Sequence, residues 1–305
     1  MAEQKQNAIA VRCHQVGGIE KNLYLYLQEY FGKENTFFVI NTDSSEAKCP
    51  DGFNSVVFNH DVILSSQELL WGDNTGWKCG DYSYYALWHA LSGYEYFWLV
   101  EPDVKFCSEK ASDFFSEFES QNIGFIAPMF GKANTNLPFY ASARYLEAEP
   151  MSCLFPITRM KCTNIGAFFG TRKKLSEKFM KERIPEHLYP NDEIFIATVA
   201  MRLGIGCAPM NKLSSFDFAM FFSNEKAFLD EDVSGVKGKF MMHPVLDKTS
   251  YVNKSIGKYQ KLFNDSYELL DFMNQTIKKC SNASVKKEFR ERLKKDFESF
   301  VNGID

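Results

Sequence analysis

The stretch "GDYSYYALWHALSGYEYFWLVEPDVKF" (residues 80–106) combines three signals that decide the fold. Residues 81–92 predict a helix that ends at a glycine. Residues 96–100, "YFWLV", are a continuous apolar run that predicts a buried strand. The strand leads directly into "EPD" at residues 101–103. A buried strand that ends in two carboxylates is either followed by an ordinary acidic turn or delivers the carboxylates to a site that binds a ligand.

The alternation of helix and strand continues on both sides of this stretch. Further strands are predicted at 8–13, 36–43, 54–59, 123–130 and 165–171, and helices at 19–31, 112–120, 173–183 and 192–204. Continuous apolar strands separated by amphipathic helices indicate a mostly parallel α/β sheet that helices cover on both faces. Residues 131–163, rich in Asn, Pro and aromatic residues, are expected to be irregular.

The alternating part predicts one domain over residues 1–250, and the lysine-rich remainder predicts a helical extension over 251–305. Within the extension, "VKKEFRERLKKDFESF" (285–300) has one apolar stripe and a basic opposite face. The stripe consists of Phe289, Leu293, Phe297 and Phe300. Such a helix either packs on the domain with its lysines in solvent or makes peripheral contact with anionic lipid.

Composition narrows the classes of function. The chain has 305 residues, a net charge of −4 and a pI near 5.8, which argues against broad nucleic-acid binding. The N-terminal residues lack an apolar run typical of a signal peptide, and no stretch approaches a membrane span. We therefore predict a cytoplasmic protein, with the inner face of the membrane as its location if the basic helix binds lipid. Eight cysteines without a C-x-x-C pair predict free thiols.

The position of Glu101 and Asp103 favours a ligand site. In open α/β sheets, ligands bind beyond the carboxyl ends of the strands, and both acids come immediately after one. In an extended segment, residues i and i+2 point to the same side, and Pro102 would stiffen that segment. Two such carboxylates can hold a divalent cation, which can hold a diphosphate. The alternative is an acidic surface turn.

Residues 80–106 resemble the core of nucleotide-sugar-dependent glycosyltransferases of the GT-A fold. Those enzymes place a helix and a hydrophobic strand before an Asp-x-Asp-type motif. Two later segments are similar to the family as well: "YPNDEIFIATVAMRLG" (189–204), an acidic helix start, and "KFMMHPVLDKTSY" (239–251), with a histidine after the core strands. The three motifs follow the family's order, so the resemblance covers roughly residues 8–250.

The resemblance implies a set of roles. Asp103, Glu101 and His243 would bind a divalent cation, Mn²⁺ or Mg²⁺, with a nucleotide sugar as the co-substrate. Glu193 or Asp192 would be the general base if the reaction inverts the anomeric centre. Acids in the first turn of a helix also stabilise its dipole in any protein. The sequence departs from the family's motif in having Glu first and Pro in the middle, and some related enzymes neutralise the diphosphate with basic residues instead of a metal.

The family's donor and acceptor segments also have counterparts here. Asp43, after the second strand, would contact the base or ribose. Lys78 would lie near phosphate, and Asp81 either near the nucleotide or as the cap of its helix. Residues 163–170, "TNIGAFFG", are similar to the loop and strand beside the donor sugar. The aromatic loop 138–159, which contains arginines, would suit an acceptor or extend the core.

The sequence therefore predicts a glycosyltransferase that moves a sugar from a nucleotide-sugar donor to a hydroxyl of a glycan or lipid-linked glycan, in surface polysaccharide synthesis. One alternative is a sugar-nucleotide nucleotidyltransferase, although "VGG" at residues 16–18 is too short for its glycine-rich phosphate loop. Another is a non-catalytic carbohydrate-binding protein on a degenerate transferase fold.

Overall fold

The computed structural model describes residues 5–43, 48–59, 69–70, 72, 75–221, 227–262, 282–288 and 291–292. The chain divides into two compact units. The first consists of residues 1–104 and 108–217, and the second of residues 105–107 and 218–305. The predicted boundary at residue 250, between a catalytic domain and a helical extension, stays a prediction.

The first unit contains most of the regular structure. Its strands are β1 (Lys5–Cys13), β2 (Thr36–Asn41), β3 (Ser55–Phe58), β4 (Tyr94–Val100), β6 (Phe125–Ala127), β7 (Gly131–Lys132), β8 (Met151–Ser152), β9 (Ile157–Lys161) and β10 (Cys207–Pro209). Its helices are α1 (Gly18–Phe31), η1 (Lys33–Asn35), α3 (Thr75–Lys78), α4 (Asp81–Ala90), α5 (Ser112–Phe115), η2 (Ser116–Phe118), η3 (Tyr140–Leu146), α6 (Cys162–Glu182), η4 (Glu186–Leu188), α7 (Asp192–Arg202) and α8 (Met210–Leu213).

Seven strands form one sheet in the order β10-β6-β9-β4-β1-β2-β3. All neighbouring pairs are parallel except those that β9 makes with β4 and β6. The predicted class, a mostly parallel α/β sheet flanked by helices, is therefore confirmed. Because the parallel strands β1, β2 and β4 run the same way, their carboxyl ends meet at one edge of the sheet.

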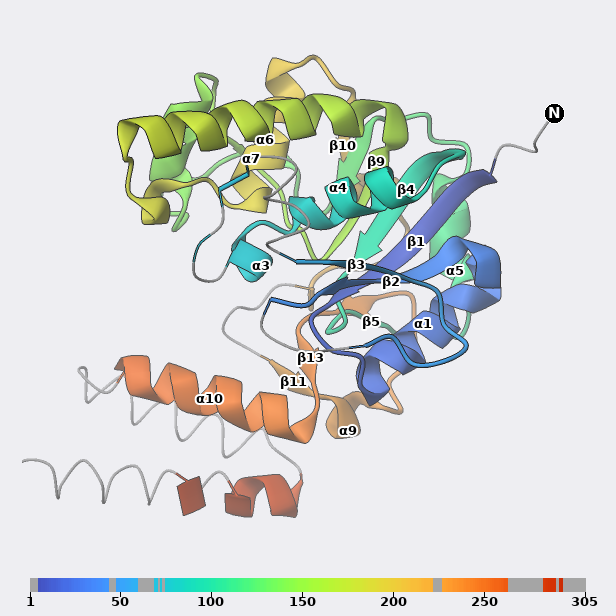
Figure 1. Cartoon of the computed structure of the whole chain (residues 1–305). Helices are drawn as coiled ribbons and strands as arrows, with labels where there is room; N and C mark the ends of the chain where they lie inside the picture. The colour runs from blue at the N-terminus through green and yellow to red at the C-terminus, as the bar shows by residue number, and fades with distance from the viewer. Residues whose placement is uncertain are drawn as a thin grey trace, which may run out of the picture. The chain divides into compact units, whose positions relative to one another are not determined.

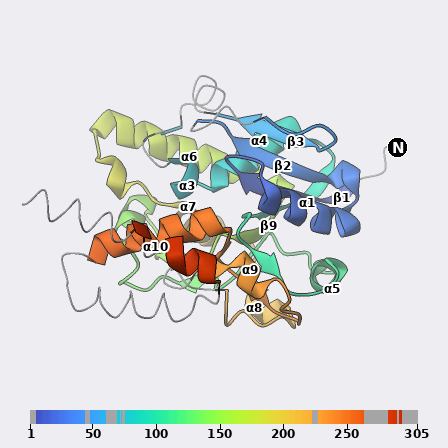
Figure 2. The ribbon, with the colours of Figure 1, turned by 90° about the horizontal axis from the view of Figure 1, so that it is seen from below.

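Helices cover both faces of this sheet. Figures 1 and 2 show α4 and α6 on one face and α1 on the other. The alternation along β1 matches the two layers, since Ala8 and Ala10 belong to the cluster that includes α4 while Ile9 and Val11 point to the opposite side. All four side chains are buried, which explains why the strand reads as a continuous apolar run.

Two sequence predictions in the middle of the chain are wrong. Residues 165–171 do not form a strand but lie inside α6. The buried residues Ile165, Phe168, Arg172, Leu175 and Phe179 recur every three or four positions, so the helical period runs through the predicted strand. Residues 131–163 are not simply irregular, because they include β9, which lies inside the sheet between β6 and β4. The predicted helix 112–120 divides into α5 and the 3₁₀ turn η2.

The second unit is smaller. Its elements are β5 (Lys105–Phe106), β11 (Phe228–Leu229), α9 (Asp230–Val233), β12 (Met241–Met242), β13 (Val245–Leu246) and α10 (Lys248–Leu262). Tyr251 and Val252 of α10 pack with Leu229 and Val285 in a small core. The stripe predicted at Phe289, Leu293, Phe297 and Phe300 lies outside the described residues. In the part of the chain that the structure describes, no helix combines the length and the apolar character that crossing a membrane requires.

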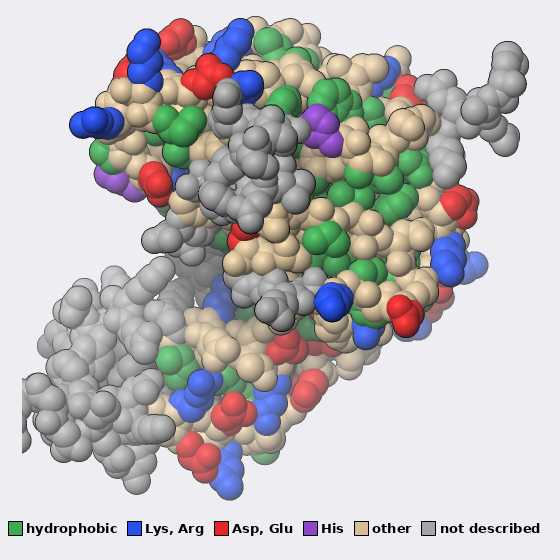
Figure 3. All heavy atoms as spheres, viewed as in Figure 1, with side chains coloured by type: hydrophobic (Ala, Val, Ile, Leu, Met, Phe, Trp, Pro, Cys, Tyr) green, Lys and Arg blue, Asp and Glu red, His purple; other side chains and the backbone are tan. Residues whose placement is uncertain are grey.

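The surface carries charges of both signs. On the face shown in Figure 3, Lys and Arg side chains are interspersed with Asp and Glu side chains. The solvent side of α6, with Lys173, Lys174, Glu177 and Lys178, has the same mixture. This distribution agrees with the small net charge of the sequence.

Candidate active site

Arg12 is the basic residue at the carboxyl end of β1. Its Nη1 donates to Oε1 of Glu101 at 2.8 Å, and the same atom lies 3.6 Å from Oδ2 of Asp192. Its Nη2 donates to the carbonyl oxygens of Gly76 at 2.6 Å and Trp77 at 3.0 Å. The side chain is only 11% exposed, so its position is fixed. Arg12 therefore connects the end of β1 to the acid that follows β4 and to the start of α7.

The sequence reasoning did not single out Arg12, although a signal was present. Arg12 is the only charged residue in the otherwise apolar run 8–13, and it stands at the end of that run. A charged side chain there can avoid the core only by reaching the carboxyl edge of the sheet.

The "EPD" segment forms a turn. The N–H of Glu101 donates to the carbonyl oxygen of Pro156 at 2.7 Å, and the N–H of Val104 donates back to the carbonyl oxygen of Glu101 at 3.2 Å. Our expectation of an extended segment with both acids on one side is therefore wrong. Pro102 instead occupies the second position of a four-residue turn, which its fixed φ favours.

The two acids of the turn and His243 form a group of candidate metal ligands. Strand β5 pairs with β12 so that Lys105 is opposite Met242. Asp103 precedes Lys105 by two residues, and His243 follows Met242 directly. One potential ligand atom from each of Glu101, Asp103 and His243 lies within 4.8 Å of the others. All three residues are half-buried.

This donor set fits a divalent metal ion. Two carboxylate oxygens and one imidazole nitrogen are ligands that divalent metal ions use in proteins. Oε1 of Glu101 accepts a hydrogen bond from Arg12 at 2.8 Å. The main-chain N–H of His243 is held by the carbonyl oxygen of Met220 at 3.2 Å, and its ring lies 5.4 Å from that of Phe221. These contacts fix where the imidazole lies.

The helix start predicted at residues 191–193 is confirmed. Asn191 is the N-cap of α7, and its side chain accepts a hydrogen bond from the N–H of Ile194 at 3.1 Å. Asp192 is buried, with Oδ2 accepting from the N–H of Gly80 at 2.9 Å and Oδ1 from the N–H of Glu193 at 2.8 Å. Glu193 is half-buried, and its Oε2 accepts from Nδ2 of Asn191 at 3.2 Å.

The pKa of Asp192 is subject to opposing effects. Burial raises the pKa of its carboxyl group well above the ordinary value, and the nearby acids Glu193, Asp81 and Glu101 raise this pKa further. The guanidinium of Arg12 opposes this shift and lowers the pKa of Asp192. Arg12 therefore favours the charged form of Asp192, and burial opposes it.

Gly80 makes this arrangement sterically possible. A Cβ atom at position 80 would lie 2.1 Å from Nη1 of Arg12 and 2.5 Å from Oδ2 of Asp192. Gly76 is similarly close to β2, since a Cβ atom there would lie 2.5 Å from Nδ2 of Asn41. The segment before α4 thus approaches the carboxyl edge of the sheet as closely as only glycine permits.

Asp81 lies in the interior of the first unit. Arg172 holds it through two hydrogen bonds, Nε to Oδ2 at 2.8 Å and Nη2 to Oδ1 at 2.7 Å, and both side chains are completely buried. The hydroxyl of Tyr85 also donates to Oδ2 at 2.8 Å. The helix cap is Gly80, so the expectation that Asp81 caps α4 is wrong. The contacts of Asp81 are those of a structural ion pair.

Lys78 and Asp43 lie at the ends of neighbouring segments. Lys78 is half-buried, donates to the carbonyl oxygen of Glu186 at 2.9 Å and lies over the ring of Phe139 at 5.4 Å. Burial lowers the pKa of Lys78. Asp43 is exposed two residues beyond β2, where its N–H donates to Oδ1 of Asn41 at 2.9 Å.

The segments expected beside the sugars differ from the predictions. Residues 163–170 form no loop and strand, because they lie in α6. In the aromatic loop, Arg144 stacks on Tyr145 at 4.8 Å from the ring centre. Arg159, which we expected on an acceptor surface, is 2% exposed and lies in β9.

The comparison with solved structures gives matches. The chain is similar in structure to mouse xyloside xylosyltransferase 1 in its apo form, with a TM-score of 0.40 and 10% sequence identity. The similarity covers 78% of this chain and 97% of the other. No protein-family model matches the sequence, and no curated protein matches it.

Proposed function

We propose that this chain is a nucleotide-sugar-dependent glycosyltransferase. The observation that carries the proposal is the group formed by Glu101, Asp103 and His243, whose ligand atoms lie within 4.8 Å of one another directly after a core strand. Open α/β sheets bind ligands beyond the carboxyl ends of their strands, so the group is where a donor diphosphate would lie. The order of the three motifs in the sequence supports the same function.

In this proposal, Glu101, Asp103 and His243 hold a divalent cation, with Mn²⁺ favoured by the imidazole ligand. A bound cation would supply positive charge to the leaving diphosphate. Arg12 adds a fixed positive charge at the same edge and keeps Glu101 oriented through the 2.8 Å bond. The proposed site thus combines the guanidinium of Arg12, which is always charged, with residues that would bind a metal ion.

We assign the general base to Glu193 and a positioning role to Asp192, for a reaction that inverts the anomeric centre. Both oxygens of Asp192 already accept main-chain hydrogen bonds inside the protein. Glu193 is half-buried at the first turn of α7, and its carboxylate could accept the proton of an acceptor hydroxyl as that oxygen attacks the sugar. Asp192 would hold Gly80 and Arg12 in place next to the start of α7.

For the nucleotide, we propose that Asp43 contacts the base or ribose and that Lys78 contacts phosphate. Asp43 is exposed beyond β2, and the half-buried ammonium of Lys78 ends α3. Asp81 is left out of the nucleotide site because Arg172 and Tyr85 occupy its carboxylate. The proposed acceptor is a hydroxyl of a glycan or lipid-linked glycan in polysaccharide synthesis.

The test is a thermal-stability screen of the full chain with UDP-, GDP-, CMP- and TDP-sugars, each with Mn²⁺, Mg²⁺ or EDTA. A ligand that binds only the folded state stabilises it by about 2.7 kcal/mol at a hundredfold excess over Kd. We expect one nucleotide class to raise the melting temperature, and EDTA or Asp103→Asn to remove most of that rise. Asp51→Asn, at an exposed position away from the sheet edge, should leave it intact.

The product of turnover separates the candidate functions. A glycosyltransferase releases the nucleoside diphosphate from a UDP-, GDP- or TDP-sugar, or CMP from a CMP-sugar, and transfers the sugar to an acceptor or to water. A nucleotidyltransferase would consume pyrophosphate, and a non-catalytic carbohydrate-binding protein would give no turnover. If no nucleotide sugar changes the melting temperature in any metal condition, the donor assignment is wrong.

A further inference from the structure

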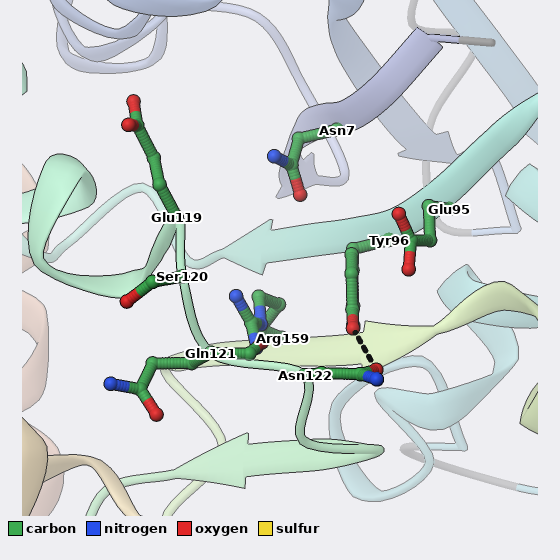
Figure 4. A pocket seen from close by; sticks show the side chains of 8 residues that line it. All are labelled: Asn7, Glu95, Tyr96, Glu119, Ser120, Gln121, Asn122 and Arg159. Atoms are coloured by element: carbon green, nitrogen blue, oxygen red, sulfur yellow. Dashed lines mark hydrogen bonds between the residues drawn. The ribbon is translucent and has the colours of Figure 1, made fainter.

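A polar pocket lies at the amino ends of β1 and β4, at the edge of the sheet opposite to Arg12 and Glu101 (Figure 4). Its volume is about 100 Å³. The residues that line it are Asn7, Glu95, Tyr96, Glu119, Ser120, Gln121, Asn122 and Arg159. Tyr96 and Arg159 are buried at its base, whereas Glu119, Ser120 and Asn122 are exposed around it. The pocket therefore opens to solvent above a charged floor.

The floor contains a buried cation with an unused donor. Arg159 is 2% exposed, and its Nη1 donates to the carbonyl oxygen of Phe118 at 2.7 Å while its Nη2 donates to that of Gln121. Its guanidinium lies over the ring of Tyr96 at 4.2 Å. Burial lowers the pKa of Arg159 to about 10, so it remains charged at neutral pH. Among the described residues, its Nε finds no hydrogen-bond partner.

The pocket also contains an unused acceptor. Oδ1 of Asn7 is buried and has no partner among the described residues. Asn7 is opposite Tyr96 in the sheet, and Trp98 is opposite Arg159, so all four side chains lie on the same face. Nε of Arg159 is a donor on β9, and Oδ1 of Asn7 is an acceptor on β1, two strands away. A ligand that carries both a hydrogen-bond acceptor and a donor would satisfy these two atoms.

The charges of the lining disfavour most other ligands. Nη1 and Nη2 of Arg159 each already donate to a carbonyl oxygen, so fewer of its five N–H groups are available to a carboxylate or phosphate. Glu95 is paired with Lys161 at 3.4 Å, and the lining also holds the negative Glu119 and the positive Arg159, so the pocket favours neither an anion nor a cation. The lining is too polar for an apolar ligand. An uncharged ligand with several hydroxyl groups remains, because each hydroxyl both donates and accepts.

We propose that this pocket is a second binding site that takes the edge of a sugar ring from a glycan. Nε of Arg159 donates to one hydroxyl, and Oδ1 of Asn7 accepts from another. About 100 Å³ holds several waters or part of a ring, so the rest of the glycan lies over the exposed residues around the pocket. The inference does not depend on the proposed catalytic function, because the two sites lie at opposite edges of the sheet.

The experiment is saturation-transfer NMR on the full chain with the methyl glycosides of glucose, galactose, xylose and N-acetylglucosamine, and with inorganic phosphate and acetate as anionic probes. We expect at least one glycoside to bind saturably and neither anion to compete. Asn7→Leu removes the acceptor at similar size and should weaken binding at least tenfold. Its melting temperature should stay the same or rise, because a buried unpaired acceptor disappears.

Gln121→Ala keeps the main-chain contact with Arg159 and truncates a side chain of the lining, so it should also weaken binding. If Asn7→Leu fails to fold, Gln121→Ala decides the question. The double variant Glu101→Gln/Asp103→Asn should bind the glycoside with unchanged affinity, which separates this pocket from the proposed donor site. The proposal is overturned if no glycoside binds, if the pocket variants bind like the parent protein, or if phosphate competes with the sugar.

Discussion

Nη1 of Arg12 lies 2.8 Å from Oε1 of Glu101, so the base that ends β1 is paired with the acid that follows β4. The same atom lies 3.6 Å from Asp192 at the start of α7. One guanidinium thus contacts two acids that belong to different parts of the proposed site. Removing it would take away the cation that the two carboxylates share.

Arg12→Ala should therefore destabilise the protein and reduce activity together. Because Asp192 would lose its cation, we expect a cost of about 3 kcal/mol in the free energy of unfolding. Asp192→Asn removes the negative partner of the same pair. The double variant Arg12→Ala/Asp192→Asn should therefore recover part of the stability that Arg12→Ala loses. Urea unfolding of both single variants and the double variant gives the coupling energy, which we expect to be about 1–3 kcal/mol. Strictly additive losses would show that the two charges do not interact.

Gly80→Ala tests the close approach at the same place. Its Cβ would fall 2.1 Å from Nη1 of Arg12, so either the guanidinium or the start of α4 must move. We expect a lower melting temperature and at least a tenfold loss of donor turnover. Gly170→Ala is the matched control, since a Cβ there has nothing within 4 Å and a helical alanine is favourable by about 0.5–1 kcal/mol. Equal effects of the two changes would contradict this account of Gly80.

The sequence predicted the strands that carry the candidate site, because their apolar runs are buried on both faces. It also predicted the start of α7, where Asn191 is a typical cap. It failed at β9, where the buried Arg159 interrupts the apolar pattern, since a single sequence does not show that Tyr96 and two carbonyl oxygens hold that charge. The partner of Arg12 was equally hidden, because 89 positions separate it from Glu101.

Two opposed predictions were open for the segment at Glu101. The segment is a turn, as the acidic-turn alternative held, and the ligand-site prediction stays a prediction, with Glu101, Asp103 and His243 as a group that could hold a metal ion. Local sequence specified the turn through Pro102. The position of His243 depends on the pairing of β5 with β12, which joins residues more than a hundred positions apart.

Asp81→Asn should act on folding and spare nucleotide recognition. The change leaves the fully buried Arg172 without its anion, for which we expect a loss of about 3–5 kcal/mol in stability. Below the melting temperature, the folded fraction should bind the nucleotide sugar with unchanged Kd, measured by calorimetry. Glu149→Gln breaks an exposed pair with Lys132 and should leave stability unchanged within error. A weaker Kd without loss of stability would instead place Asp81 at the nucleotide.

Glu193→Gln and Asp192→Asn should separate a base from a positioning residue. Loss of a general base lowers kcat by about 10²–10⁴-fold and leaves donor binding intact, which we expect for Glu193→Gln. Asp192→Asn keeps an oxygen acceptor for only one of the two N–H groups that Asp192 now holds, so its effect should include weaker donor binding and lower stability. Steady-state kinetics with the donor found in the stability screen, together with calorimetry, measures both quantities. If Glu193→Gln retains full kcat while Asp192→Asn loses it, Asp192 is the base, and burial would have tuned its carboxyl group for that role.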